Sequence, residues 1–218
     1  MSTAALRCLA EYTETSETFK KHTKVIRDVI PNFWNILSDL VKPVGGEFNT
    51  LNHADSWTNN FMFKYNDDGS VSEIKLLDFQ MVRYASPVID LVYFIWSSAS
   101  DDVRRHRLDE LFLFYVDQLN NNLSRVNCSE RVTYDYVQKE VIRLSHLALG
   151  IVTGFVPFTS ENSVQDLEQF LVKGSEETTY QTYKSYFNRD QFRNNVLPKI
   201  VEQLESAGVF KHLENCTK

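Results

Sequence analysis

The chain has 218 residues, of which 43% are hydrophobic and 24% charged, an ordinary globular composition with enough apolar side chains for one sizeable core. Its formal net charge of −6 argues against nucleic-acid binding, which needs a basic surface, but is compatible with an anionic ligand bound through a metal ion. Three scattered cysteines without metal-type spacing predict free thiols in a reducing compartment.

The first part of the chain is predicted to be helical. Residues 1–21 contain no apolar run long enough for a signal peptide. Across 17–42 apolar residues recur at steps of three and four, and Pro31 interrupts them, which predicts two helices or one kinked helix. The segment 42–48 then contains a glycine pair typical of a turn, and it leads into a short strand over 50–52.

The next segment, 61–79, has the pattern of a β-hairpin. An aromatic strand over 61–65 is followed by the turn sequence NDDGS at 66–70 and a return strand over 71–79. Because the two strands run in opposite directions, Asn60 before the first and Asp78 near the end of the second come to the same end of the hairpin.

The rest of the chain predicts helices. One helix is expected to start with Ser86 as N-cap and Pro87 at its first position, and others cover 101–123, 134–156, about 163–172 and about 189–206, the last stopped by Gly208. The most apolar run, 147–158, is too short to span a bilayer. We therefore expect a soluble, cytoplasmic protein without membrane contact, with a mostly α-helical α+β fold and a single domain over 1–218.

The polar residues of one loop and the hairpin carry a chemical pattern. A kinase-type phosphoryl-transfer site requires its residues in a fixed order. The chain has that order: His53-x-Asp55-x4-Asn60, then a strand, a turn, a strand and Asp78. Mg²⁺ prefers hard oxygen ligands, so the Asn60 amide and the Asp78 carboxylate fit as metal ligands. Asp55 fits as the carboxylate that orients the attacking hydroxyl, and His53 fits better as a hydrogen-bonding brace of the loop than as a base.

Two side chains near this pattern have ordinary alternatives. Asp90, at the start of the helix that follows, either braces the loop or stabilises the positive end of that helix. Trp57 fits packing better than substrate contact.

The same segments resemble a known family. The chain is similar to the choline-kinase-like and aminoglycoside-phosphotransferase-like kinases, and most of all to the ecdysteroid-kinase-like branch. Two segments carry this resemblance, LNHADSWTNNFMFKY and IKLLDFQMVRYASPVIDLVYFIW. That branch commonly has H-G-D-x-W-x-N-N, D-F-Q and S-P-x-x-D-L, and Ala54 stands here in place of the usual Gly. The resemblance is strong over 50–98 and looser over the flanking helices at 17–43 and 101–206.

The resemblance implies the C-terminal lobe of a protein-kinase-like fold and ATP-dependent phosphorylation of a small-molecule hydroxyl, with an ecdysteroid as one candidate. It makes Asp55 the catalytic carboxylate and Asn60 and Asp78 the magnesium ligands. The acceptor pocket would be built by the C-terminal helices, around 144–158 and the tyrosines Tyr180, Tyr183 and Tyr186, although tyrosines at steps of three are more typical of a packed helix face.

A kinase also needs a Gly-rich strand pair and a strand lysine over the phosphates. The chain has 7 Gly and no G-x-G-x-x-G, so we expect the ATP-clamping N-terminal lobe to be absent from it. Three hypotheses remain open: a truncated small-molecule kinase lobe that needs the missing lobe or a protein partner, a pseudokinase that binds a small ligand or protein without turnover, and a helical protein with an accidental acidic turn.

Overall fold

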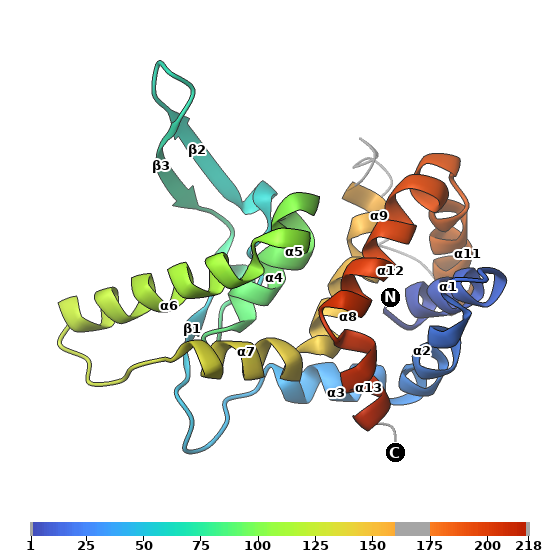
Figure 1. The fold of residues 1–218 in the computed structure, drawn as a ribbon, viewed down its shortest axis with the longest axis horizontal. Helices are drawn as coiled ribbons and strands as arrows, with labels where there is room; N and C mark the ends of the chain where they lie inside the picture. Colours follow the sequence, from blue (N-terminus) through green and yellow to red (C-terminus); the bar gives the residue numbers. More distant parts are fainter. Residues whose placement is uncertain (1, 160–174, 217–218) are drawn as a thin grey trace. The chain divides into compact units, whose positions relative to one another are not determined.

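The computed structural model describes residues 2–159 and 175–216 and divides the chain into two compact units (Figure 1). The helical unit comprises Met1–Leu40 and Ser145–Lys218, and the hairpin unit comprises Val41–Leu144. Helices predominate, and the strands form two antiparallel two-stranded sheets, so the predicted α+β, mostly α-helical fold class is confirmed. The helix expected at about 163–172 lies outside the described residues.

The helical unit is built around α1 (Ser2–Thr15), which packs against α2, α8 and α11. Phe158 packs edge-on against the rings of Tyr183 and Tyr186, at centroid distances of 5.2 and 4.6 Å. The other elements of the unit are η1 (Lys20–His22), α2 (Thr23–Val29), η2 (Ile30–Asn32), α3 (Phe33–Leu40), α8 (Ser145–Gly154), α9 (Val156–Thr159), α11 (Glu176–Phe187), the π-helix η5 (Phe192–Val196), α12 (Leu197–Ser206) and α13 (Val209–Cys216).

Several predictions for this unit are confirmed. Pro31 lies in the 3₁₀ turn η2, so the N-terminal pattern forms two helices, α2 and α3. The three tyrosines of α11 are buried, as a packed helix face requires. The predicted final helix over about 189–206 is confirmed in its extent, since 190–206 is helical and Gly208, with a φ of 75°, follows its end. The π-helical stretch η5 within it and the further helix α13 were not predicted.

The hairpin unit contains both sheets and four helices. β1 (Thr50–Asn52) pairs with β4 (Arg83–Ala85), and β2 (Phe61–Tyr65) pairs with β3 (Val71–Leu76). The helices are α4 (Ile89–Ser98), α5 (Asp101–His106), α6 (Leu108–Arg125) and α7 (Tyr134–Arg143), and short 3₁₀ turns occupy η3 (Thr58–Asn60) and η4 (Phe79–Met81).

Four boundaries in the later part of the chain differ from the predictions. The return strand ends at Leu76 and not at residue 79. The helix α4 begins at Ile89, because Ser86 does not cap it: the Ser86 hydroxyl accepts the Val88 N–H, at 3.3 Å, in a turn that precedes the helix. The predicted helix over 101–123 is two helices that meet at Arg107. The predicted helix over 134–156 is divided between α7 and α8. The strand β4 was not predicted, because three residues are too few to show an alternating pattern.

Within the described residues, no single helix is both long and apolar enough to cross a membrane. Tyr134–Arg143 and Ser145–Thr159 satisfy the length and composition requirements only when taken together as a bent pair.

Candidate active site

The loop between β1 and β2 is held in place by one carboxylate of α4. The two Asp90 oxygens accept the backbone N–H groups of His53 and Ala54, each at 2.7 Å, and the Ser56 hydroxyl donates to the Asp90 carbonyl at 3.0 Å. Ala54 adopts a left-handed conformation with φ of 63°. The loop therefore makes a tight turn directly before Asp55, and Asp90 occupies two backbone donors that the turn would otherwise leave unpaired.

Both carboxylate oxygens of Asp55 are hydrogen-bonded. Oδ1 accepts the Tyr93 hydroxyl at 2.8 Å, and Oδ2 accepts the Asn60 amide at 2.9 Å. Each carboxylate oxygen has a second lone pair, so these bonds orient Asp55 and leave it able to accept a further hydrogen bond.

Tyr93 is a stable neutral donor in this arrangement. The side chain is buried, and burial raises the pKa of its hydroxyl far above its ordinary value, as does the negative charge of Asp55 beside it. The Tyr93 proton therefore stays on the phenol throughout the physiological pH range. Tyr93 and Asp90 lie three positions apart on α4, so one helix face carries both contacts to the loop.

The Asn60 side chain has a defined orientation. Its Nδ2 donates both to the Asp55 backbone carbonyl, at 2.8 Å, and to Asp55 Oδ2. Because both partners are acceptors, the NH₂ group must face them and the amide oxygen must face away. Among the described residues nothing donates a hydrogen bond to that oxygen, so it remains available as a metal ligand.

The end of the hairpin is tied to the same loop through the backbone of Leu77. Its N–H donates to the Asn60 carbonyl at 2.9 Å, and its carbonyl accepts His53 Nε2–H at 2.7 Å. The next residue, Asp78, has a left-handed φ of 60°, which turns the chain out of the strand. Asp78 is exposed, and its Oδ2 accepts the Gln80 amide at 3.2 Å.

The predicted site residues thus occupy one connected region of the hairpin unit. His53, Asp55, Asn60 and Asp90 are joined by hydrogen bonds within one loop and α4, and Asp78 joins them through the main chain of its neighbour Leu77. Sequence reasoning missed Tyr93, for which the available signal was its spacing of three from Asp90 on a predicted helix.

The donor set determines which metals are compatible with the site. Across the residues that the structure describes, no three His, Cys, Asp or Glu side chains gather into a metal cluster. One carboxylate and one amide oxygen would not hold a metal such as zinc, which is bound by a cage of several protein ligands. Mg²⁺ keeps several waters and is bound by few protein oxygens together with phosphate oxygens, so Asn60 and Asp78 fit it.

Neither the curated proteins nor the solved structures contain a match to the chain. The model of one family, described as ecdysteroid kinase-like, matches residues 1–128, a span that includes the loop, the hairpin and α4. The match covers more than half of the chain, which therefore belongs to the ecdysteroid kinase-like family, a family of kinase-like phosphotransferases.

Proposed function

We propose that this chain carries the catalytic and metal-binding residues of an ATP-dependent phosphotransferase that acts on a hydroxyl group of a small molecule. In this proposal Asp55 is the catalytic carboxylate, Asn60 and Asp78 are the magnesium ligands, and His53 and Asp90 brace the loop. A hydroxylated sterol of the ecdysteroid type is the first acceptor to test, because the family is described by that substrate.

The observation that carries the proposal is the pair of hydrogen bonds on Asp55. Positioning and electrostatic stabilisation supply most of the catalysis of phosphoryl transfer. A carboxylate fixed by Tyr93 on one oxygen and Asn60 on the other is positioned before any substrate binds. A surface carboxylate in an ordinary turn would not need two such donors, one of them a buried phenol.

Asp55 and the two metal-binding residues have separate roles in phosphoryl transfer. The Asp55 carboxylate accepts a hydrogen bond from the acceptor hydroxyl and orients its oxygen toward the terminal phosphorus of ATP. As the new O–P bond forms and the bond to the ADP oxygen breaks, Asp55 takes the hydroxyl proton. Asn60 and Asp78 would hold Mg²⁺, whose charge would offset the negative charge of the phosphates.

Nucleotide binding can be tested separately from turnover. The thermal unfolding of the 218-residue chain is measured with and without Mg·ATP, for the wild type, Asp78→Asn and the matched control Asp67→Asn, which removes one negative charge at the far turn of the hairpin. Nucleotide at a hundred times its dissociation constant should stabilise the wild type and the control by about 2.7 kcal/mol. Asp78→Asn should lose most of that stabilisation, and the absence of a shift in the wild type would exclude autonomous nucleotide binding.

Turnover is then measured by phosphate transfer from ATP to a panel of hydroxylated sterols. Asp55→Asn should lower kcat by about 10²- to 10⁴-fold and leave the Mg·ATP shift intact. Tyr93→Phe keeps the ring and removes only the hydroxyl, so it should lower kcat with a smaller effect on the KM for ATP. Full turnover in Asp55→Asn would show that Asp55 is not the catalytic carboxylate.

The same experiments address the alternative of an inactive binding protein. The chain contains no G-x-G-x-x-G segment, the feature that favours this alternative. Sterol binding that needs neither magnesium nor ATP, without phosphate transfer, would support it against the kinase proposal.

A further inference from the structure

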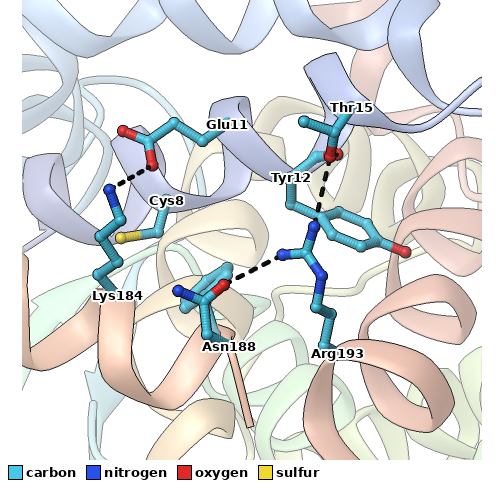
Figure 2. Close-up of a pocket in the computed structure, with 8 residues that line it drawn as sticks. Cys8, Glu11, Tyr12, Thr15, Lys184, Asn188 and Arg193 are labelled. Atoms are coloured by element: carbon cyan, nitrogen blue, oxygen red, sulfur yellow. Dashed lines mark hydrogen bonds and ion pairs between the residues drawn. The ribbon is translucent and has the colours of Figure 1, made fainter. Parts of the chain in front are cut away.

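The helical unit contains a charged pocket that the phosphotransferase proposal does not use. Figure 2 shows the pocket between α1 on one side and α11 and η5 on the other. Its volume is about 160 Å³, room for roughly five water molecules at about 30 Å³ each. The lining combines the rings of Tyr12 and Phe187 with the polar ends of Glu11, Lys184, Asn188 and Arg193.

Arg193 is the residue with unused binding capacity. Its guanidinium donates to Asn188 Oδ1 at 3.2 Å and to Thr15 Oγ1 at 3.4 Å, both long bonds to neutral acceptors, and lies 5.3 Å from the Tyr12 ring centroid. No described carboxylate pairs with it. A guanidinium carries five N–H donors, so several remain for a ligand, and their planar fork matches the two oxygens of a carboxylate.

The charges in the pocket sum to one net positive charge. Lys184 forms an ion pair with Glu11 at 3.5 Å, so these two cancel and Arg193 is left over. Burial raises the pKa of the Cys8 thiol to about 12 and also raises the pKa of the Tyr12 hydroxyl, so neither adds negative charge near neutral pH. Outside the lining, the positive charge of Arg7 lowers the pKa of Cys8 and the negative charge of Glu202 raises the pKa of Tyr12. These two neighbouring charges have opposite signs.

The backbone near Arg193 is also unusual. Arg193 lies in η5, a π-helix in which the Leu197 N–H bonds to the Phe192 carbonyl. Pro198 has no N–H to bond the Asn194 carbonyl four residues earlier, and its ring clashes with that carbonyl, which accounts for the widening of the preceding turn. Single π-turns inside helices are rare and occur often at functional sites.

We propose that this pocket binds a small monocarboxylate, with the carboxylate on the Arg193 guanidinium and the Asn188 amide and the apolar part against Tyr12 and Phe187. The single net positive charge favours a monoanion over a phosphate dianion. The volume admits an acid of about five non-hydrogen atoms, and the aromatic walls favour an organic body over a bare inorganic ion.

Propionate is the probe that tests this ligand class. The Arg193 Nε–H resonance of the full chain is followed in ¹H–¹⁵N spectra during titration with sodium propionate, with propionamide as the neutral analogue and sodium chloride at matched ionic strength. Propionate should give a saturable shift with Kd in the millimolar range, and propionamide and chloride should not. A response equal for propionamide, or tighter binding of inorganic phosphate than of propionate, would overturn the proposal.

Variants with opposite expected effects distinguish a loss of binding from a folding defect. Their affinities for propionate are measured by calorimetry at constant ionic strength. Arg193→Gln should weaken propionate binding at least tenfold, whereas Lys199→Gln, an equal charge change on the exposed face of α12, should leave it within twofold. Glu11→Gln removes the negative charge and frees Lys184, so it should tighten binding several-fold. Unchanged affinity in both Arg193→Gln and Glu11→Gln would contradict the assignment.

Discussion

The two units of this chain are stabilised in different ways. In the helical unit most large hydrophobic side chains are buried and the others half-buried, and Trp34 is the one strongly exposed exception among its described residues. In the hairpin unit many are exposed, including Met62 at 58%, Ile74 at 55% and Phe79 at 58%. The candidate active site lies in the second unit, so its geometry depends on hydrogen bonds between the loop and α4 more than on a surrounding apolar core.

The hairpin itself shows the contrast most clearly. Phe61 pairs with Leu76 and Phe63 with Ile74, and paired residues share a face, so one face of the hairpin is apolar and partly exposed. The opposite face carries Lys64 and Glu73. A hairpin with so little burial adds little to the free energy of unfolding, and its position is determined by the Leu77 bonds to His53 and Asn60.

The largest expected effect lies in the helical unit. Phe33 is fully buried, and its ring lies so close to Gly150 that a Cβ there would be 3.3 Å from Phe33 Cζ. Phe33→Ala should reduce the free energy of unfolding of this unit by about 3 to 5 kcal/mol, because the cavity cannot close fully. Hydrogen exchange resolved by residue is the suitable measurement, since the two units need not unfold together.

The matched truncation in the hairpin unit is Ile74→Ala. It removes an exposed aliphatic side chain and should change the free energy of unfolding by less than about 0.5 kcal/mol. A loss comparable to that of Phe33→Ala would mean that the hairpin face is covered in solution, and the contrast between the units would fail.

The second effect is a pH dependence confined to the helical unit. Burial lowers the pKa of His146 to about 4, with a smaller contribution from His212, and His146 Nε2 has no described hydrogen-bond partner. The unfolded chain binds a proton near pH 6.5 and the folded chain does not until about pH 4. Stability therefore falls as the pH drops through this window, by up to about 3 kcal/mol.

His146→Gln is the variant that isolates this contribution. It should flatten the pH dependence of unfolding between pH 6.5 and 4, although His22 and His212, whose pKa values burial also lowers, leave a residual slope. Parallel curves for the wild type and the variant, measured by urea unfolding at several pH values, would show that His146 binds protons equally in both states.

The third effect tests whether the active-site loop depends on one carboxylate. Asp90→Asn leaves a single acceptor oxygen for the two N–H groups of His53 and Ala54, so one buried donor loses its partner at a cost of about 1 to 3 kcal/mol. Exchange of these two amides should accelerate roughly ten- to hundredfold. The control Asp102→Asn, on exposed α5, should leave them unchanged; equal protection in both variants would mean that packing alone holds the loop.

The sequence reveals the strands and turns of this structure more accurately than the points at which its helices break. The strands 50–52 and 61–65 and the turn over 66–70 were predicted with correct bounds, because turn residues and aromatic alternation are local signals. The split at Arg107 was missed, because the same apolar spacing suits a continuous helix and tertiary packing decides where it breaks. The π-helix η5 was also missed, although Pro198 is a local signal of an irregular helical turn.

In the candidate site, too, local patterns could be read from the sequence, whereas contacts between distant segments could not. The residues His53, Asp55, Asn60 and Asp78 were nominated from spacing and family pattern, and the structure places them in one connected region. Tyr93 and the pocket around Arg193 were not nominated. The spacing of Tyr93 from Asp90 was only a weak signal, since a phenol on an apolar helix and an arginine before a proline each have common structural explanations. Their relevance comes from distances between segments far apart in the chain.

The smallest effect concerns the one position where the loop departs from the family pattern. Ala54 has a φ of 63°, a conformation that costs an L-residue with a Cβ about 1 to 2 kcal/mol and costs glycine almost nothing. Ala54→Gly also makes the unfolded chain more flexible, which offsets part of the gain, so a net stabilisation of about 0.5 kcal/mol is expected. The increase should appear in the exchange protection of the loop amides and not in the helical unit. A net loss of loop protection would mean that the Ala54 methyl group makes a stabilising contact, and that apolar packing, more than hydrogen bonding, fixes the turn before Asp55.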